Sequence, residues 1–245
     1  MRILAMHKSN SFSEAGHAPP PEMMAAMGQL VGSMMQRGIL VATEGLCPSV
    51  QGARLTFHKG KRTVTPGPLK GANEHIAGFG ILRVRDLDEA IAWATKFAES
   101  IGDVEIDVRP VSEPWDIGAM PKPDGLTTRR YMAARKADRT TESGAMPSKE
   151  AMARTDAVIE EMTKAGVLVA SIGLAPSAQG ARARFNNGSR TVTDGPFTEA
   201  KELIAGYAVL EAPSVKAAID LSADFAKIIG DVEIDFLPIV KMEAR

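Results

Sequence analysis

The sequence predicts an α+β fold in which two ferredoxin-like (β-α-β-β-α-β) repeats form an intramolecular pseudo-dimeric α/β barrel. Three observations predict it. The stretch at 63–69 recurs at 191–197, so one module is present twice. Each copy shows the order of a split βαβ unit, which places both helices on one face of an antiparallel sheet. Such a sheet leaves its second face bare, and the other copy is available to cover it.

The two copies align without a gap, each residue of the first matching the residue 128 positions later. About half of the positions from Gly38 to Val111 are identical to their counterparts, far more than unrelated segments share. The first copy spans residues 1–111, a linker rich in Pro and Gly spans 112–128, and the second copy spans 129–245. This linker is long enough to bring the copies together, so we expect a repeat-to-repeat pseudo-dimer within the chain.

Residue patterns define the elements of each copy. Apolar positions at spacings of three and four indicate helices, and alternating apolar and polar residues indicate strands with one wet face. Glycines after the helices fit C-caps, and Asp86 with Glu89 forms a capping box. The expected elements of the first copy are a strand at 2–7, a helix at 21–37, a strand from 39, a hairpin at 53–65, a strand at 76–84, a helix at 87–101 and a strand at 104–108.

Two long polar stretches occupy equivalent places in the copies. Residues 8–20 are rich in Ser, Gly and Pro, and residues 136–147 have the same character. Paired loops of this length in a compact domain are typical of lids or of unstructured connectors. We keep both interpretations open from the sequence.

Composition excludes several classes of protein. The 245 residues are 44% hydrophobic with a net charge of −1, which is ordinary for a globular chain and offers no attraction to nucleic acid or to an anionic membrane. The only cysteine is Cys47, which fits a reducing compartment. No apolar run approaches the roughly 20 residues that cross a bilayer. The histidines show no metal-ligand spacing. We therefore expect a cytoplasmic protein without a metal or a cofactor.

The second copy carries the segment Asp194-Gly195-Pro196-Phe197, followed by Lys201-Glu202 and Gly206-Tyr207. With these residues, both copies resemble the YCII-related family over nearly their whole length, and the second resembles its DGPF branch. The resemblance implies a dimeric α/β barrel of ferredoxin-like units and no settled activity. Some relatives are associated with alternative sigma factors. Shorter relatives carry a histidine on the first helix, which is missing from both first helices here, so the chemistry suggested for it is not transferred.

Two acidic residues are candidates for catalysis. Asp194 lies where a strand breaks, and a carboxylate there could orient water, act as a base or hold a cation. It could instead accept hydrogen bonds from its own turn. Glu44 belongs to a Glu-Gly-Leu segment common in the family. The first copy has Pro66 in place of Asp194, and the second has Ile172 in place of Glu44. If Glu44 and Asp194 meet across the copies, one composite site survives; if each site lies within one copy, both are incomplete.

Paired arginines suggest where a small anionic or polar ligand would bind. Arg54 and Arg182 occupy equivalent strand positions, and guanidinium groups near a cleft receive carboxylates or phosphates. Ion pairing with Glu74 or Glu202 at the surface is the alternative interpretation. His7 at a strand end could titrate in a cleft or be solvated. The complete set of predicted ligand-binding residues is Arg54, Arg182, Gln51, Gln179, Thr193, Gly195 and His7.

Three functional hypotheses follow. The first is a small-molecule-binding module or enzyme of YCII type with a polar cleft beside Asp194. The second is a non-catalytic interaction or regulatory protein, for example a partner associated with a sigma factor. The third, a relative of the barrel monooxygenases, depends on fold analogy alone. A polar pocket touching Asp194 or Glu44 would favour the first hypothesis, and a filled cleft with a broad apolar patch would favour the second.

Overall fold

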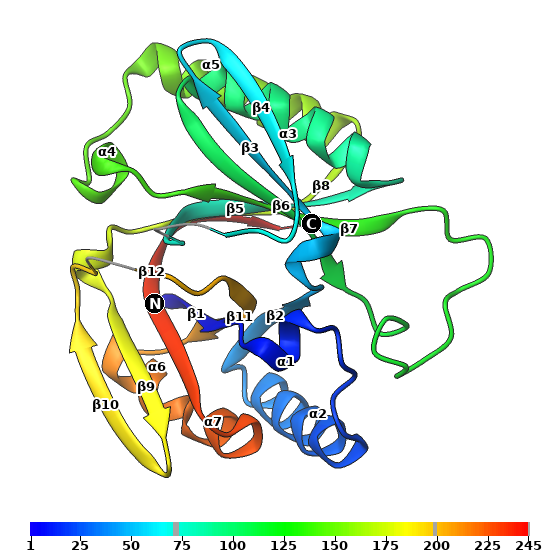
Figure 1. The fold of residues 1–245 in the computed structure, drawn as a ribbon. Helices are drawn as coiled ribbons and strands as arrows, with labels where there is room; N and C mark the ends of the chain where they lie inside the picture. The colour runs from blue at the N-terminus through cyan, green and yellow to red at the C-terminus, as the bar shows by residue number, and fades with distance from the viewer. Residues whose placement is uncertain (71–73, 198–199, 245) are drawn as a thin grey trace.

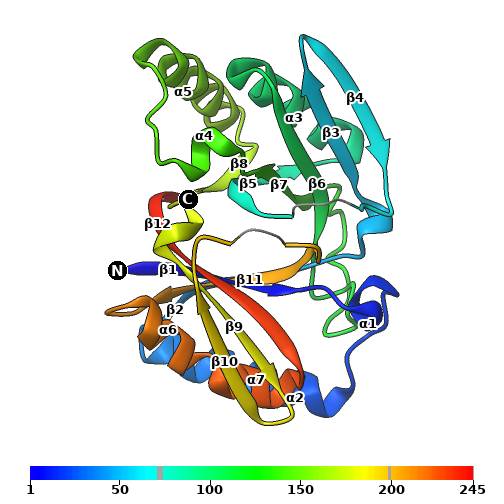
Figure 2. The same ribbon diagram turned by 60° about the vertical axis from the view of Figure 1, so that its left-hand side comes forward.

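The protein is organised around a closed barrel of antiparallel strands (Figures 1 and 2). The structure is a computed structural model that describes residues 1–70, 74–197 and 200–244. Around the barrel the strand order is β1-β11-β2-β6-β7-β5-β8-β12, and β12 pairs again with β1. The strands are β1 (Arg2–Lys8), β2 (Leu40–Leu46), β5 (Ile76–Val84), β6 (Val104–Ser112), β7 (Arg129–Lys136), β8 (Leu168–Leu174), β11 (Ile204–Glu211) and β12 (Val232–Ala244).

The two copies exchange strands within this barrel. Strand β1 of the first copy pairs with β11 and β12 of the second, and β7 of the second copy pairs with β5 and β6 of the first. The second strands follow the same rule, since β2 pairs with β11 and β8 pairs with β5. Each half of the barrel therefore combines the first β-α-β segment of one copy with the second segment of the other. The barrel expected from the sequence is present, but the prediction that each copy forms its own ferredoxin-like sheet is not confirmed.

The helices form two pairs that cover opposite sides of the barrel, and each pair also mixes the copies (Figure 1). Apolar residues of one pair pack on β3, β5, β6, β7 and β8, and those of the other pair pack on β1, β2, β9, β11 and β12. The first pair is α3 (Leu87–Ile101) with α5 (Lys149–Lys164), and the second is α2 (Pro21–Gln36) with α6 (Val215–Leu221) and α7 (Ala223–Ile229).

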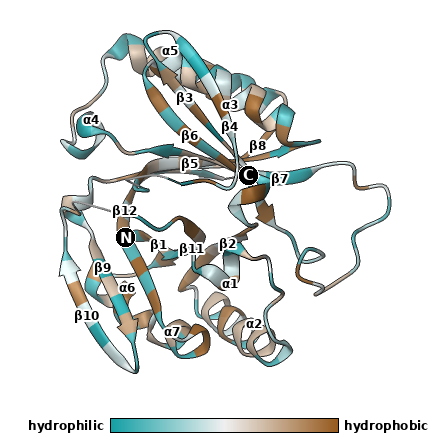
Figure 3. Cartoon of the chain, in the orientation of Figure 1, coloured by the Kyte–Doolittle hydropathy of each residue, from teal (hydrophilic) through white to brown (hydrophobic). Residues whose placement is uncertain are grey.

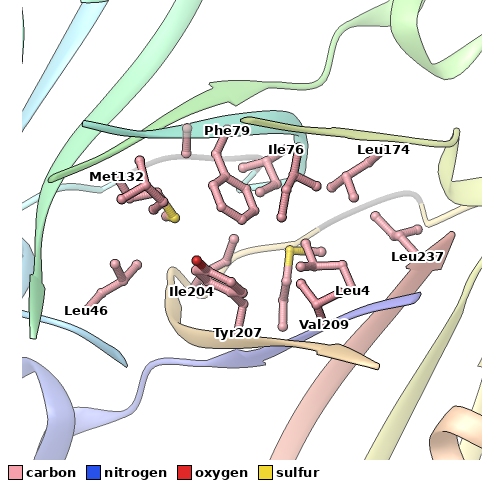
Figure 4. Packing of buried hydrophobic residues seen from close by; sticks show 14 of the residues in the cluster. Leu4, Leu46, Ile76, Phe79, Met132, Leu174, Ile204, Tyr207, Val209 and Leu237 are labelled. Atoms are coloured by element: carbon pink, nitrogen blue, oxygen red, sulfur yellow. The ribbon is translucent and has the colours of Figure 1, made fainter. Parts of the chain in front are cut away.

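The interior of the barrel is a packed hydrophobic core (Figure 4). Phe79 and Tyr207, which are repeat counterparts, meet inside it with ring centroids 4.7 Å apart. Leu4, Met132 and Leu174 from three further strands fill the space around them. Such interiors are as densely packed as organic crystals, so a ligand must bind outside the barrel lumen.

A β-hairpin extends from each half of the barrel. Strand β3 (Ala53–His58) pairs with β6 and with β4 (Lys61–Pro66), and β9 (Ala181–Asn186) pairs with β12 and with β10 (Ser189–Asp194). These hairpins lie where the sequence predicts them. Every residue of β4 and of β10 is exposed.

The stretches at 8–20 and 136–147 contain short anchored helices. Asn10 caps α1 (Ser11–Glu14), and Asp138 caps α4 (Arg139–Glu142), each in a capping box. The carboxylate of Glu14 accepts a hydrogen bond from the amide of Ser49, 2.9 Å away, and Glu142 accepts the equivalent bond from Ser177. In Figure 3 the ribbon of α4 has the colour of hydrophilic residues. Neither stretch is a free lid, because each carries a side chain that holds the 3-10 turn beside it. Among the described residues, no helix has the length and apolarity needed to cross a membrane.

Candidate functional site

Four charged side chains form a buried group, here called the first cluster: Arg54, Glu74, Asp107 and Lys136. The guanidinium of Arg54 donates to both oxygens of Asp107, from Nε at 2.6 Å and from Nη2 at 2.8 Å. Nη2 also donates to Glu74 at 3.0 Å. The ammonium of Lys136 bonds Glu74 and lies 2.8 Å from Asp107. Two cations and two carboxylates thus neutralise one another in a space that is closed to solvent on the barrel side.

These contacts control the ionisation of the cluster. Burial alone would raise the pKa of Asp107, but hydrogen bonds from Arg54 and the charge of Lys136 hold that pKa below its ordinary value. Desolvation likewise opposes the charge of Arg54, yet bonding to Asp107 raises the pKa of its guanidinium. Both groups therefore stay charged at neutral pH.

The first cluster takes residues from both copies because of the strand exchange. Arg54, Glu74 and Asp107 belong to the first copy, whereas Lys136 ends β7 of the second. A matching second cluster joins Lys8 of β1 to Asp235 and Arg182 of the second copy. Lys8 Nζ lies 2.7 Å from Asp235 Oδ2, and Arg182 Nε lies 2.6 Å from Asp235 Oδ1.

The two clusters differ in their fourth member. Glu74 is only 1% exposed and bonds both cations of the first cluster, whereas its counterpart Glu202 is exposed. In the second cluster, Arg182 lies over the ring of Phe197, 4.7 Å from its centroid, and His75 stacks on that ring. Arg182 of the second cluster is thus contacted by the stacked ring of Phe197, whereas its counterpart Arg54 in the first cluster is contacted by the carboxylate of Glu74.

A pocket of about 580 Å³ opens beside the first cluster. Arg54, Lys70 and Lys136 line it, and the backbone carbonyl of Lys70 accepts a 2.9 Å hydrogen bond from Arg54. Its size is within the usual range for small-molecule sites. Its lining residues are Arg54, Thr65, Pro68, Leu69, Lys70, Asp103, Val104, Glu105, Lys136, Ala137 and Asp138.

The repeated turns beside the clusters are tightly packed. A Cβ added at Gly67 would lie 1.9 Å from the carbonyl oxygen of Ser49, and one at Gly195 would lie 1.8 Å from that of Ser177. The hydroxyls of the same serines accept hydrogen bonds from the amides of Leu69 and Phe197. These close contacts explain why both copies have glycine in the repeated segment.

Asp194, Thr193 and Gly195 lie at the end of β10 and in the turn that follows. Asp194 is exposed and pairs with Ala181, whereas Thr193 pairs with Arg182. Neighbouring residues of a strand point to opposite faces, so Thr193 shares the face of the second cluster and Asp194 lies on the other. The structure therefore brings Thr193 and Arg182 together and separates the Asp194 side chain from them.

Glu44 lies in a different ionic group. Its carboxylate bonds Arg130 of β7, and the second nitrogen of that guanidinium lies 2.7 Å from the buried Glu113. Burial raises the pKa of Glu44 despite the opposing charge of Arg130. The register places Glu44 beside Tyr207, where the other half of the barrel has Ile172 beside Phe79. Whether Glu44 works with Asp194 across the copies stays a prediction.

The remaining predicted ligand residues lie apart. Gln51 and Gln179 are exposed on the 3-10 turns Ser49–Gln51 and Ser177–Gln179. His7 packs against Phe225, with ring centroids 5.2 Å apart, beneath α7. Arg54 is the one member of the predicted set that lines the pocket of the first cluster.

Sequence reasoning missed the lysine and aspartate partners of the two arginines. Lys8 and Lys136 are repeat counterparts, as are Asp107 and Asp235. Their identity in both copies is the signal that could have found them, because charged positions on an exposed surface diverge more freely. The alternative interpretation, in which Arg54 forms an ion pair with Glu74, names the right partner. The pair is buried, however, and does not lie at the surface.

Fold and site together define a tandem-repeat α/β-barrel protein with two pseudo-equivalent charged clusters. The model of the YCII-related domain matches residues 1–108 and 130–228, so the chain belongs to this family and contains two tandem copies of its domain. No curated protein matches the chain, and no solved structure matches it either.

Proposed function

We propose that the protein binds a small polar molecule in the pocket beside the first cluster. The observation that carries the proposal is the position of this pocket of about 580 Å³ against Arg54 and Lys136, both held in place by Glu74 and Asp107. Side chains that are already fixed lose little conformational freedom on binding, which favours affinity. A small-molecule-binding module is also what the sequence predicts, and the ligand proposed here would contact Arg54 of the first copy.

The lining charges favour one class of ligand. Arg54, Lys70 and Lys136 supply positive charge, and Asp103, Glu105 and Asp138 supply negative charge in equal number. Since Glu74 and Asp107 already neutralise Arg54 and Lys136, the lining presents both signs without a positive excess, and it complements a zwitterion, or a neutral molecule with both donors and acceptors, better than a multiply charged anion. We therefore propose a zwitterionic ligand of amino-acid size.

The cluster supports binding more than it supports a chemical step. Its carboxylates and cations form close pairs with one another, and the pKa of Asp107 is lowered, whereas a general base works best with a pKa near the pH of the medium. The function proposed is accordingly that of a binding module. Its regulatory alternative, in which the protein acts through a partner surface, predicts no ligand in this pocket.

Calorimetric titration of zwitterionic amino acids, small dicarboxylates and inorganic phosphate tests the proposal. Thr65 lines the pocket from exposed β4, so Thr65→Trp should block the pocket without disturbing the barrel. Its repeat counterpart gives a matched variant, Thr193→Trp. We expect binding that is lost in Thr65→Trp and retained in Thr193→Trp. The reverse pattern would move the site to the second cluster, and binding unaffected by either variant would reject a site at these clusters.

A further inference from the structure

A second cavity, separate from the pocket of the first cluster, lies between α2, α7 and the strands β1 and β11. It has a volume of about 80 Å³. None of the residues around it carries a charge at neutral pH, and most are apolar. They include Met27, Val31, Met34, Leu221 and Phe225 from the helices, with His7, Thr43 and Tyr207 from the strands.

His7 is the unusual member of this lining. Its ring contacts Phe225, and the residue is partly exposed. Burial lowers the pKa of His7 to about 4, so the imidazole is neutral at physiological pH and offers one N–H donor and one nitrogen acceptor. The ring nitrogens are not among the fully buried atoms that lack a partner, so they are open to a ligand that enters the cavity.

On the other side of the barrel, two of the residues equivalent to those lining the cavity are of a different type. Trp93 stands in place of Leu221, and Arg135 stands in place of His7. The helix that carries Trp93 runs unbroken as α3, whereas its counterpart breaks between α6 and α7 at Ser222, whose hydroxyl bonds the carbonyl of Ala218. The smaller side chain and the helix break lie together at the cavity.

We infer that this cavity binds a small, neutral, apolar molecule with one hydrogen-bonding group, and that this group meets the imidazole of His7. A dry apolar cavity of ~150 Å³ accommodates benzene with its six carbons, so the present cavity, about half that size, suits a ligand on the order of three non-hydrogen atoms. The absence of charge in the lining, among the described residues, disfavours an anion because nothing there would compensate its lost hydration. A short-chain alcohol has the required chemistry.

Titration with ethanol, followed by the ring resonances of the histidines in NMR spectra, tests the inference. His7 is assigned by the resonance that disappears in His7→Phe. We expect a saturable shift of the His7 resonance in the wild-type protein and no saturable shift with acetate. In His7→Phe, where methyl resonances of the lining methionines report binding, the affinity should fall about fivefold, as for the loss of one hydrogen bond.

Leu221→Trp places the tryptophan of the opposite side into the cavity, and it should weaken ethanol binding at least tenfold. Met35→Trp adds the same side chain to an exposed position of α2 and should bind as the wild type does. If Leu221→Trp does not fold, Leu221→Phe provides a smaller obstruction. A wild-type protein without a saturable His7 shift, equal binding of acetate, or unchanged binding in the folded Leu221 variant would each overturn the inference.

Discussion

Lys8 and Asp235 form a buried ion pair, 2.7 Å from Nζ to Oδ2, that joins the first strand of the chain to the last. The side chains are 5% and 1% exposed. Lys136 and Asp107 form the equivalent pair at 2.8 Å between the start of the second copy and the end of the first. Both pairs join a residue of one copy to a residue of the other, so the ionic clusters also hold the exchanged strands in place.

Replacing Lys8 with Met should destabilise the protein strongly. It leaves Asp235 buried with one cation fewer, and breaking a buried pair costs roughly 3–5 kcal/mol, with the remaining bond to Arg182 keeping the loss near the lower figure. Urea unfolding measures the change. Arg2→Met on the same strand breaks an exposed pair with Glu211 and should cost less than about 1 kcal/mol. Equal losses in the two variants would contradict the buried role of Lys8.

Cutting the linker should leave the two copies bound to each other. Residues Met120 to Asp124 are exposed, so a protease site introduced there is accessible. Because β1 and β7 each pair with strands of the other copy, separation would break strand ladders on both sides of the barrel. The cleaved protein should elute as a single complex in size-exclusion chromatography and come apart only in denaturant. Separate elution of two folded halves under native conditions would disprove the exchange.

Gly67→Ala should be among the most damaging glycine substitutions. The new Cβ would press on the backbone of Ser49, which cannot move without displacing the 3-10 turn, so we expect a loss of at least about 3 kcal/mol. Gly28→Ala, in the middle of α2, meets nothing within 4 Å and should stabilise the protein by roughly 0.5–1 kcal/mol. Thermal denaturation of both variants checks the opposite signs. A mild effect of Gly67→Ala would contradict the close packing of the turn at Gly67 against the backbone of Ser49.

His7 should make stability depend on pH in a defined window. Its pKa is about 4 in the folded protein and 6.5 in the unfolded chain, so the unfolded chain binds more protons between these values. Stability from His7 is therefore complete above pH 6.5 and decreases as the pH falls towards 4, by up to about 3 kcal/mol. The unfolding free energies of wild type and His7→Phe, compared at several pH values, isolate this contribution. Parallel pH profiles would show that His7 is accessible to water.

Much of the fold is predictable from residue patterns. The 128-residue repeat, the helices and strands of each copy and the hairpins follow from spacing and from glycine and proline positions, whereas the closed barrel is what the resemblance to the YCII-related family implies. Strand partners do not. Since β1 and β7 are similar strands, and β5 and β11 offer them similar edges, periodicity is equally consistent with pairing inside a copy or between copies. The length and course of the connections decide between these arrangements, and local sequence does not encode them.

The site was harder to predict for a related reason. Arg54 was recognisable as a candidate, but its burial depends on Lys136, which comes from the other copy through the exchanged strand. Asp194 attracts attention because it belongs to the segment that resembles the DGPF branch, yet its position in the strand places it on the face away from Arg182. A residue such as Asp194 can serve the turn in which it lies, whereas the charged residues that are identical in both copies indicate where the clusters form.

The exchange of β1 and β7 also affects how this chain can change over time. A duplicated domain usually leaves one copy as a spare that is free to acquire differences. Here each helix-covered side of the barrel is assembled from both copies, so neither is dispensable, and a deletion in one would damage both sides at once. The copies still differ at many positions, such as Leu221 and Trp93, where one side can vary while the shared framework is preserved.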